Sequence, residues 1–239
     1  MAKLLVTGAN GHVGSNLCRL LVGEGHDDPQ TTYFLAKTKS ERLAWQLAEE
    51  LGIDMVTVNP TAILGQYDYR ITPSTKLVRG FLEGSAMSAQ GGVNVVDVRD
   101  VARGHLMALQ KGRRGERYML VSENHEMREL ASMVTELTGI KVPHAPLPRW
   151  MIPIAIPSTG LLMRALGKKD ILTVQEAREF VGRWGWFDPS KSKAELGFEA
   201  RPTRETLDHT IRWLVHSGAL SPKVENRLQE RFQPDQAWN

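Results

Sequence analysis

The feature that most restricts the fold of this chain is a short apolar run that stops at a glycine-rich turn near its start. Leu4–Thr7 supplies the run, and Gly8–Gly14 supplies the turn, with glycine at its first, fourth and seventh positions. Residues 13–23 then carry apolar side chains at helical spacing. A buried parallel strand followed by a tight turn and a helix is typical of this order. The opening therefore predicts an α/β fold built on a parallel sheet.

The same turn predicts a site for a phosphate group. Glycines let the backbone approach a pyrophosphate closely, and the free N–H groups at the start of the next helix face its negative charge. The glycine spacing is G-x-x-G-x-x-G, so a purely structural turn that binds nothing is the alternative. Asp27 and Asp28 lie where an acidic contact to a ribose is expected by count, but no strand fits in front of them, and we assign them no role.

The rest of the chain alternates between apolar strand-like runs and helical stretches. This alternation predicts a Rossmann-like parallel sheet with a small substrate lobe toward the C-terminus. We expect a nucleotide-binding core at residues 1–120, a mainly helical substrate lobe with closing helices at 121–220, and a polar tail at 221–239. Further predicted strands are 53–58, 93–96 and 117–121, and further predicted helices are 33–50, 100–110, 127–139, 161–166, 174–181 and 203–216. A turn at residues 187–191 also predicts a short helix that ends at Gly197.

The composition is that of an ordinary globular protein and argues against several function classes. The chain has 239 residues, of which 41% are apolar and 24% charged, and its formal net charge is +3. No basic block is interleaved with aromatic residues, so we expect no nucleic-acid partner. The single cysteine, Cys18, fits a reducing compartment. The apolar stretch 150–166 is short and interrupted by prolines, so we expect a cytoplasmic protein without a membrane span. We predict no metal site.

Tyr33 and Lys37 lie four residues apart in the predicted helix 33–50, which places them on one face of that helix. An ammonium group near a phenol favours the phenolate form, which makes a tyrosine a better acid or base near neutral pH. The same ammonium group can reach the ribose hydroxyls of a dinucleotide. Such pairs are also common on solvated helix faces. A catalytic role for this pair is therefore supported only by the motifs around it.

Four motifs, taken in order, resemble those of the extended short-chain dehydrogenases/reductases, in the style of their epimerase/dehydratase and dihydroflavonol reductase-like members. The resemblance covers nearly the whole chain up to about Leu220, and four motifs in the correct order are more specific than any one of them. The motifs are the phosphate turn Thr7–Gly14, the active-site helix Tyr33–Trp45, the nicotinamide strand and loop Val56–Thr61 with Leu64 and Gly65, and the strand-to-helix junction Asn94–Ala102 beside the substrate lobe.

The resemblance implies an NAD(P)-dependent oxidoreductase or epimerase that acts on a carbonyl or hydroxyl group of a small molecule. By this resemblance Tyr33 is the general acid/base at the reacting oxygen, and Lys37 orients the cofactor ribose and tunes Tyr33. The cofactor is NAD or NADP. Both residues also count as cofactor-binding, together with the turn backbone of Gly8, Asn10, Gly11, His12 and Val13, and with Asn59, Pro60 and Thr61 at the nicotinamide.

A large part of the family's pattern is missing between the first two motifs. In the family, most of the nucleotide-binding sheet separates the phosphate turn from the active-site tyrosine, whereas Gly14 and Tyr33 are only 19 positions apart. The missing block, after about residue 26, would hold three parts of the family's site and sheet. These are the acidic or basic residue that contacts the adenosine ribose, the middle strands, and a serine that hydrogen-bonds the oxyanion together with the tyrosine. Thr31 and Thr32 do not replace that serine, because they start the same helix and serve as caps. We therefore expect the first strand to lack its usual partners on both sides.

Two function classes stay open. The first is an active oxidoreductase or epimerase, and the second is a catalytically impaired deletion form or relic that keeps only partial nucleotide binding. A natural or deliberate deletion, a defective gene copy and a stretch omitted from the written sequence would each explain the short spacing. A homodimer is an open alternative to a monomer. Asp97 and Asp100 are conspicuous, but turn formation and capping account for them, so we assign them no chemistry.

Overall fold

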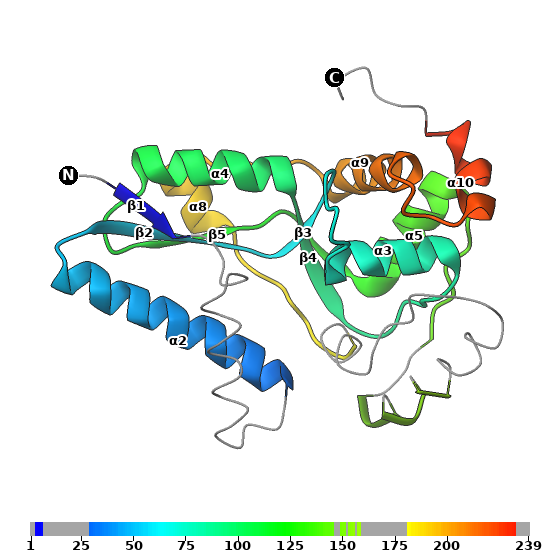
Figure 1. The fold of residues 1–239 in the computed structure, drawn as a ribbon, viewed down its shortest axis with the longest axis horizontal. Helices are drawn as coiled ribbons and strands as arrows, with labels where there is room; N and C mark the ends of the chain where they lie inside the picture. The colour runs from blue at the N-terminus through cyan, green and yellow to red at the C-terminus, as the bar shows by residue number, and fades with distance from the viewer. Residues whose placement is uncertain are drawn as a thin grey trace. The chain divides into compact units, whose positions relative to one another are not determined.

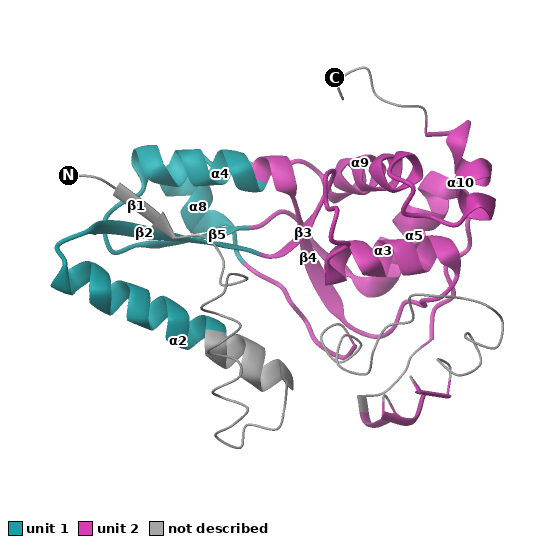
Figure 2. Cartoon of the chain, in the orientation of Figure 1, with its two compact units in different colours: residues 1–60, 101–120, 188–199 teal, residues 61–100, 121–187, 200–239 magenta. Residues whose placement is uncertain are grey.

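The computed structural model of the chain describes residues 3–6, 29–145, 149–151, 153–155, 157–158 and 181–232, with side chains from residue 37 onward. The chain forms two compact units, which Figure 2 colours separately. Unit 1 comprises Met1–Pro60, Val101–Leu120 and Asp188–Glu199, and unit 2 comprises Thr61–Asp100, Val121–Phe187 and Ala200–Asn239. The predicted helices 161–166 and 174–181 fall outside the described residues, apart from residue 181.

Unit 1 is a parallel three-stranded sheet with helices on both faces (Figure 1). Its strands are β1 (Lys3–Val6), β2 (Asp54–Pro60) and β5 (Arg117–Leu120), in the order β1-β2-β5. Helix α2 (Pro29–Glu50) covers one face, and α8 (Ser190–Leu196) with the end of α4 (Val98–Lys111) covers the other. All three strands correspond to predicted ones, and the predicted α/β fold with a parallel sheet is confirmed.

The central strand of unit 1 is buried because it is apolar on both faces. Met55, Val56 and Val58 are exposed by 1%, 1% and 4%, and a parallel sheet covered on both faces requires such continuous apolar runs. Strand β1 pairs with β2 along the whole of Lys3–Val6. We expected the first strand to lack its usual partners on both sides. The structure pairs it on one side with β2, and among the described residues it is an edge strand on the other.

Unit 2 combines a small mixed sheet with the main apolar core of the described residues. Strand β4 (Gly92–Asp97) pairs in parallel with β3 (Ala62–Leu64) and antiparallel with β6 (Asn124–Glu126). Leu64 of β3 and Val93 and Val95 of β4 belong to the same core cluster as apolar side chains of the surrounding helices. These helices are α3 (Pro73–Glu83), α5 (Met127–Thr138), α9 (Thr203–His216) and α10 (Pro222–Gln229), and a 3-10 helix, η1, spans Arg149–Met151.

The helices of unit 2 confirm part of the sequence prediction and correct another part. Helices α5 and α9 and strand β4 are confirmed, whereas α3, β3 and β6 do not follow from the sequence patterns above. Within the expected polar tail, residues 222–229 form α10, and Leu228 and Phe232 are buried in the core. Two apolar side chains one turn apart anchor this segment despite its polar composition.

The compact units describe packing, so the predicted functional division at residues 120 and 220 stays a prediction. No helix in the part of the chain that the structure describes combines the length and the apolar character needed to cross a membrane. Within the same residues, no group of His, Cys, Asp and Glu side chains is placed to hold a metal ion.

Candidate functional site

The predicted phosphate turn at Gly8–Gly14 lies outside the described residues, which resume at Pro29. Strand β1 ends at Val6, so the strand that the turn is expected to follow is present. Turns that bind a pyrophosphate lie at the carboxyl end of such a strand. The roles expected for the backbone of Gly8, Asn10, Gly11, His12 and Val13 stay predictions.

Tyr33 and Lys37 lie on the continuous helix α2, four residues apart. The helix expected for this part of the chain is confirmed, and it carries both residues on one face. The side chain of Tyr33 lies outside the described ones, and the side chain of Lys37 is half-buried. The catalytic roles of both residues stay predictions.

Asn59 and Pro60 end strand β2, and Thr61 begins the next segment, which belongs to unit 2. The Nδ2 of Asn59 donates a hydrogen bond to Glu41 Oε2 over 3.3 Å. The Oδ1 of Asn59 is buried and accepts no hydrogen bond from any described residue. Buried polar atoms are nearly always paired, so this oxygen is an acceptor in need of a donor.

Glu41 is the site residue that sequence reasoning missed. Its Oε1 accepts hydrogen bonds from Trp45 Nε1 at 3.2 Å, from Thr57 Oγ1 at 3.3 Å and from Arg117 Nε at 2.7 Å. With Asn59, four donors from α2, β2 and β5 converge on one carboxylate. All of these contacts lie within unit 1.

A signal for Glu41 was present in the sequence. Tyr33, Lys37 and Glu41 follow one another at four-residue intervals, which places them along one face of a helix. Nothing in that spacing indicates which strands the third residue would contact, because its partners on β2 and β5 are 16 to 76 positions away.

In unit 2, Asn94 on β4 is the centre of a second polar cluster. It is 1% exposed, and its Oδ1 accepts hydrogen bonds from Thr61 Oγ1 at 2.8 Å and from the backbone N–H of Ser122 at 3.1 Å. Its Nδ2 donates to the Ser122 carbonyl oxygen and to Asn124 Oδ1. These contacts fix Thr61, the last residue expected beside the nicotinamide, to the sheet of unit 2.

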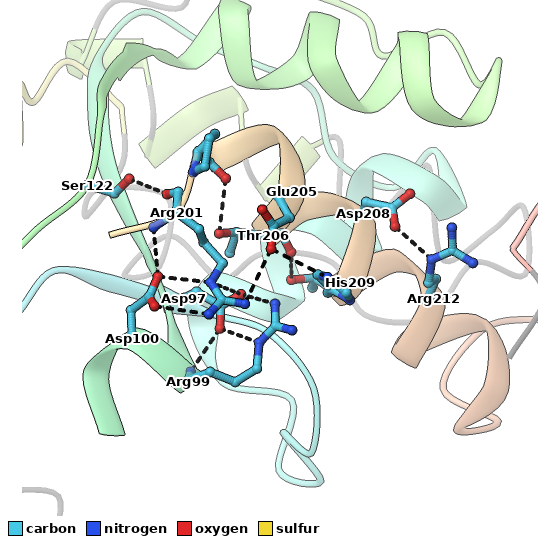
Figure 3. A network of polar contacts seen from close by, with 12 residues as sticks. Asp97, Arg99, Asp100, Ser122, Arg201, Glu205, Thr206, Asp208, His209 and Arg212 are labelled. Atoms are coloured by element: carbon cyan, nitrogen blue, oxygen red, sulfur yellow. Dashed lines mark hydrogen bonds and ion pairs between the residues drawn. The ribbon is translucent and has the colours of Figure 1, made fainter. Parts of the chain in front are cut away.

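Figure 3 shows Asp97, at the end of β4, and Asp100, in the first turn of α4, with their arginine partners. Asp97 accepts hydrogen bonds from the Arg99 backbone N–H, Nε and Nη2 at 2.8, 2.9 and 2.8 Å. Asp100 accepts from the Arg201 backbone N–H, Nε and Nη2 at 2.8, 3.0 and 3.1 Å. Both carboxylates are almost fully buried. The turn formation expected of Asp97 is confirmed by its bond to the backbone two residues on.

The ionisation of Asp97 follows from these contacts. Burial opposes the charged form, but the hydrogen bonds and charge of Arg99, together with the charge of Arg201, outweigh it and lower the pKa of Asp97 below its ordinary value. The pKa of Arg201 moves the other way: burial opposes its charge, and Asp100, Asp97 and Glu205 together raise its pKa. These contacts tie the start of α4 to the segment before α9.

Comparison with known proteins identifies relatives for most of the chain. The family model described as the NAD dependent epimerase/dehydratase family matches residues 25–120. Sterol demethylase protein B of Methylococcus capsulatus is 29% identical over 195 residues, which is 81% of this chain and 59% of that protein. Tetraketide alpha-pyrone reductase 1 of Arabidopsis thaliana is 32% identical over 196 residues, which is 80% of this chain and 50% of that protein.

A solved structure supports the same conclusion about the fold. The crystal structure of a nucleoside-diphosphate-sugar epimerase from Pseudomonas aeruginosa superposes with a TM-score of 0.61 and 29% identity, covering 80% of this chain and 57% of that one. The predicted Rossmann-like α/β class is therefore confirmed. The chain spans about half the length of the curated relatives it matches.

Proposed function

Because this chain belongs to the NAD-dependent epimerase/dehydratase family, the extended short-chain dehydrogenases/reductases, we propose that it carries the catalytic helix of an NAD(P)-dependent reductase that acts on a carbonyl group. The observation that carries the proposal is the position of Tyr33 and Lys37 on α2, within the segment that the family model matches. The strand that ends at Asn59 and Pro60 is tied to the same helix through Glu41.

The described residues fit a dinucleotide cofactor at one testable point. The unpaired buried Oδ1 of Asn59 is an acceptor that an N–H or O–H donor of the cofactor or substrate would satisfy. Asn59, Pro60 and Thr61 would border the nicotinamide, and the backbone of the turn from Gly8 to Val13 would hold the pyrophosphate. A bound nicotinamide supplies or accepts the hydride.

The side chains of α2 supply the proton chemistry. Tyr33 donates its phenolic proton to the carbonyl oxygen of the substrate as that oxygen gains negative charge, and it takes the proton back in the reverse reaction. The Lys37 ammonium group stabilises the phenolate that remains and holds the ribose hydroxyls of the cofactor. Both residues lie on α2, four positions apart, so a single helix sets their spacing.

A second candidate is epimerisation of a nucleotide-linked sugar. It is favoured by the likeness to the epimerase from Pseudomonas aeruginosa, and it would use the same tyrosine as acid/base. We further propose a small-molecule substrate, a functional division into residues 1–120 and 121–220, and a cytoplasmic location, which the single Cys18 supports. A homodimer stays a prediction.

Replacing Tyr33 with phenylalanine tests the proposal. Tyr33→Phe keeps the ring and removes the proton that the reaction uses, so turnover should fall by about a hundredfold or more. The measurement is a single-turnover assay with NADH or NADPH and a panel of aldehydes and ketones, on protein whose intact mass agrees with 26.7 kDa. Full activity in Tyr33→Phe would refute the assignment. Cofactor binding without any turnover in the wild-type protein would favour the impaired relic.

A further inference from the structure

We propose that Glu41 is a positioning residue that sets how helix α2 is seated on the sheet and which atom of the Asn59 amide is left free to bind a ligand. The inference rests on the proposed function: the position of α2 on the sheet affects the reaction because α2 carries Tyr33 and Lys37. Glu41 makes its contacts to the sheet and to its own helix, so its effect on the reaction is exerted through the residues it holds.

The packing of α2 explains why a polar contact decides its seating. The face turned toward the sheet carries Lys37, Glu41, Ala44, Trp45 and Ala48, which are half-buried or buried. Among the described side chains of α2 only Ala48 is fully buried, and Ala44 and the large ring of Trp45 are half-buried, so the helix removes little apolar area from water. The hydrophobic contribution to packing scales with the area buried. The leucines of this part of the chain are more exposed: Leu43 and Leu47 of α2, and Leu51 just after it, are 50%, 44% and 69% exposed.

The carboxylate of Glu41 compensates for this weak apolar contact. It ties α2 to β2 through Thr57 and Asn59, and to β5 through Arg117. Hydrogen bonds and ion pairs are directional, whereas apolar contact between smooth surfaces permits sliding and rotation. Because Lys37 is one helical turn away and Tyr33 two turns away, a rotation of α2 about its axis would move both of them relative to the end of β2.

The same carboxylate also determines how the Asn59 side chain is oriented. A carboxylate accepts hydrogen bonds and donates none, so the Asn59 amide must turn its Nδ2 toward Glu41. Oδ1 is then the atom that is left buried and without a partner among the described residues. The free position at Asn59 is therefore an acceptor, which selects an N–H or O–H donor on the ligand.

The experiment compares Glu41→Ala and Glu41→Gln with the matched control Glu195→Ala. Glu195 lies on α8 in the same unit and likewise ties a helix to β5, accepting from Tyr118 Oη at 2.8 Å and from Arg113 Nη2 at 2.6 Å. These two hydrogen bonds involve neither α2 nor β2. The two glutamates thus share charge, unit and strand partner, and they differ in the helix that they hold.

In the turnover assay, Glu41→Ala should lower kcat by about tenfold or more, because small displacements of reacting groups have large effects on rate. KM for the carbonyl substrate should change by less than about threefold, since the Glu41 carboxylate binds other side chains of the protein and not that substrate. Glu41→Gln keeps one acceptor oxygen and should recover part of the rate. Glu195→Ala should retain kcat within about twofold, even where its thermal midpoint falls as far as that of Glu41→Ala.

Hydrogen exchange provides a readout that does not depend on activity. Glu41→Ala should raise exchange in α2 and at residues 57–61, whereas Glu195→Ala should raise it in α8 and at residues 113–118. If the wild-type protein shows no turnover, the proposed function fails and the exchange pattern still decides the role of Glu41. If Glu41→Ala does not fold, Glu41→Gln is compared with Glu195→Ala in its place, because glutamine keeps the size of the side chain. The proposal would be overturned if Glu41→Ala and Glu195→Ala raised exchange in the same segments. It would also be overturned if, in both variants, the loss of kcat were proportional to the fall in thermal midpoint.

Discussion

The apolar core of the described residues is divided unequally between the two units, and helix α2, for which we propose the catalytic role, lies in the unit with less of it. The main core cluster, which includes Phe81, Leu130, Ile211 and Leu214, belongs entirely to unit 2. Unit 1 has buried strands, but among the described side chains of its longest helix, α2, only Ala48 is fully buried. Unit 2 is therefore held mainly by apolar burial, and α2 by directional polar contacts.

Helices α9 and α2 show the difference most directly. In α9 the apolar residues Leu207, Ile211 and Leu214 follow at intervals of four and three, and all three are fully buried. In α2 the leucines Leu43 and Leu47 also follow at an interval of four, yet both are exposed. Periodicity alone thus predicts that a helix has an apolar face, and the neighbouring elements decide whether that face is covered.

The largest expected effect tests this contrast with the same substitution in both helices. Leu214→Ala should lower the free energy of unfolding by about 2–5 kcal/mol, because it removes a fully buried side chain and leaves a cavity. Leu47→Ala, at a side chain that is 44% exposed, should change it by less than about 0.5 kcal/mol. Urea unfolding followed by tryptophan fluorescence measures both. Equal losses would mean that α2 is packed as tightly as α9.

An intermediate effect is expected where charged residues are buried in unit 2. Asp100→Ala leaves Arg201 without the carboxylate that accepts three of its hydrogen bonds, and should destabilise the protein by about 1–3 kcal/mol. The control is Asp208→Ala, which removes a more exposed partner of Arg212 on the surface of α9 (Figure 3). Such helical ion pairs contribute about 0.3–0.5 kcal/mol. A control as destabilised as Asp100→Ala would show that burial is not what distinguishes the two.

The smallest effect is a dependence of stability on acid. The pKa of Asp97 is lower in the folded protein than its ordinary value of 3.8, so its contribution is fully present above that value and is lost as the pH falls through the lowered folded pKa. Asp97→Asn should therefore be less stable than wild type at neutral pH, and the difference should shrink as the pH is lowered below the ordinary value. Urea midpoints measured across this range test it. A constant difference at all pH values would contradict the assignment.

Local patterns predicted the elements whose signals lie within a few residues. The run Ile53–Val58 predicted β2, and the amphipathic stretch Thr203–His216 agrees with the bounds of α9. The polar composition after residue 221 was misleading, because Leu228 and Phe232 provide buried apolar contacts in that segment. Two buried side chains among many polar ones do not stand out until the surface they contact is known.

The sequence by itself determined the α/β class, the helix that carries Tyr33 and Lys37, and the strand that leads to Asn59. These follow from periodicities of two and 3.6 residues and from turn-forming glycines, which act over short stretches of chain. Only the tertiary structure decided that β1 pairs with β2 and that Glu41 meets Thr57, Asn59 and Arg117. Those contacts depend on which distant segments are neighbours in space, and a residue's own surroundings in the sequence do not specify that.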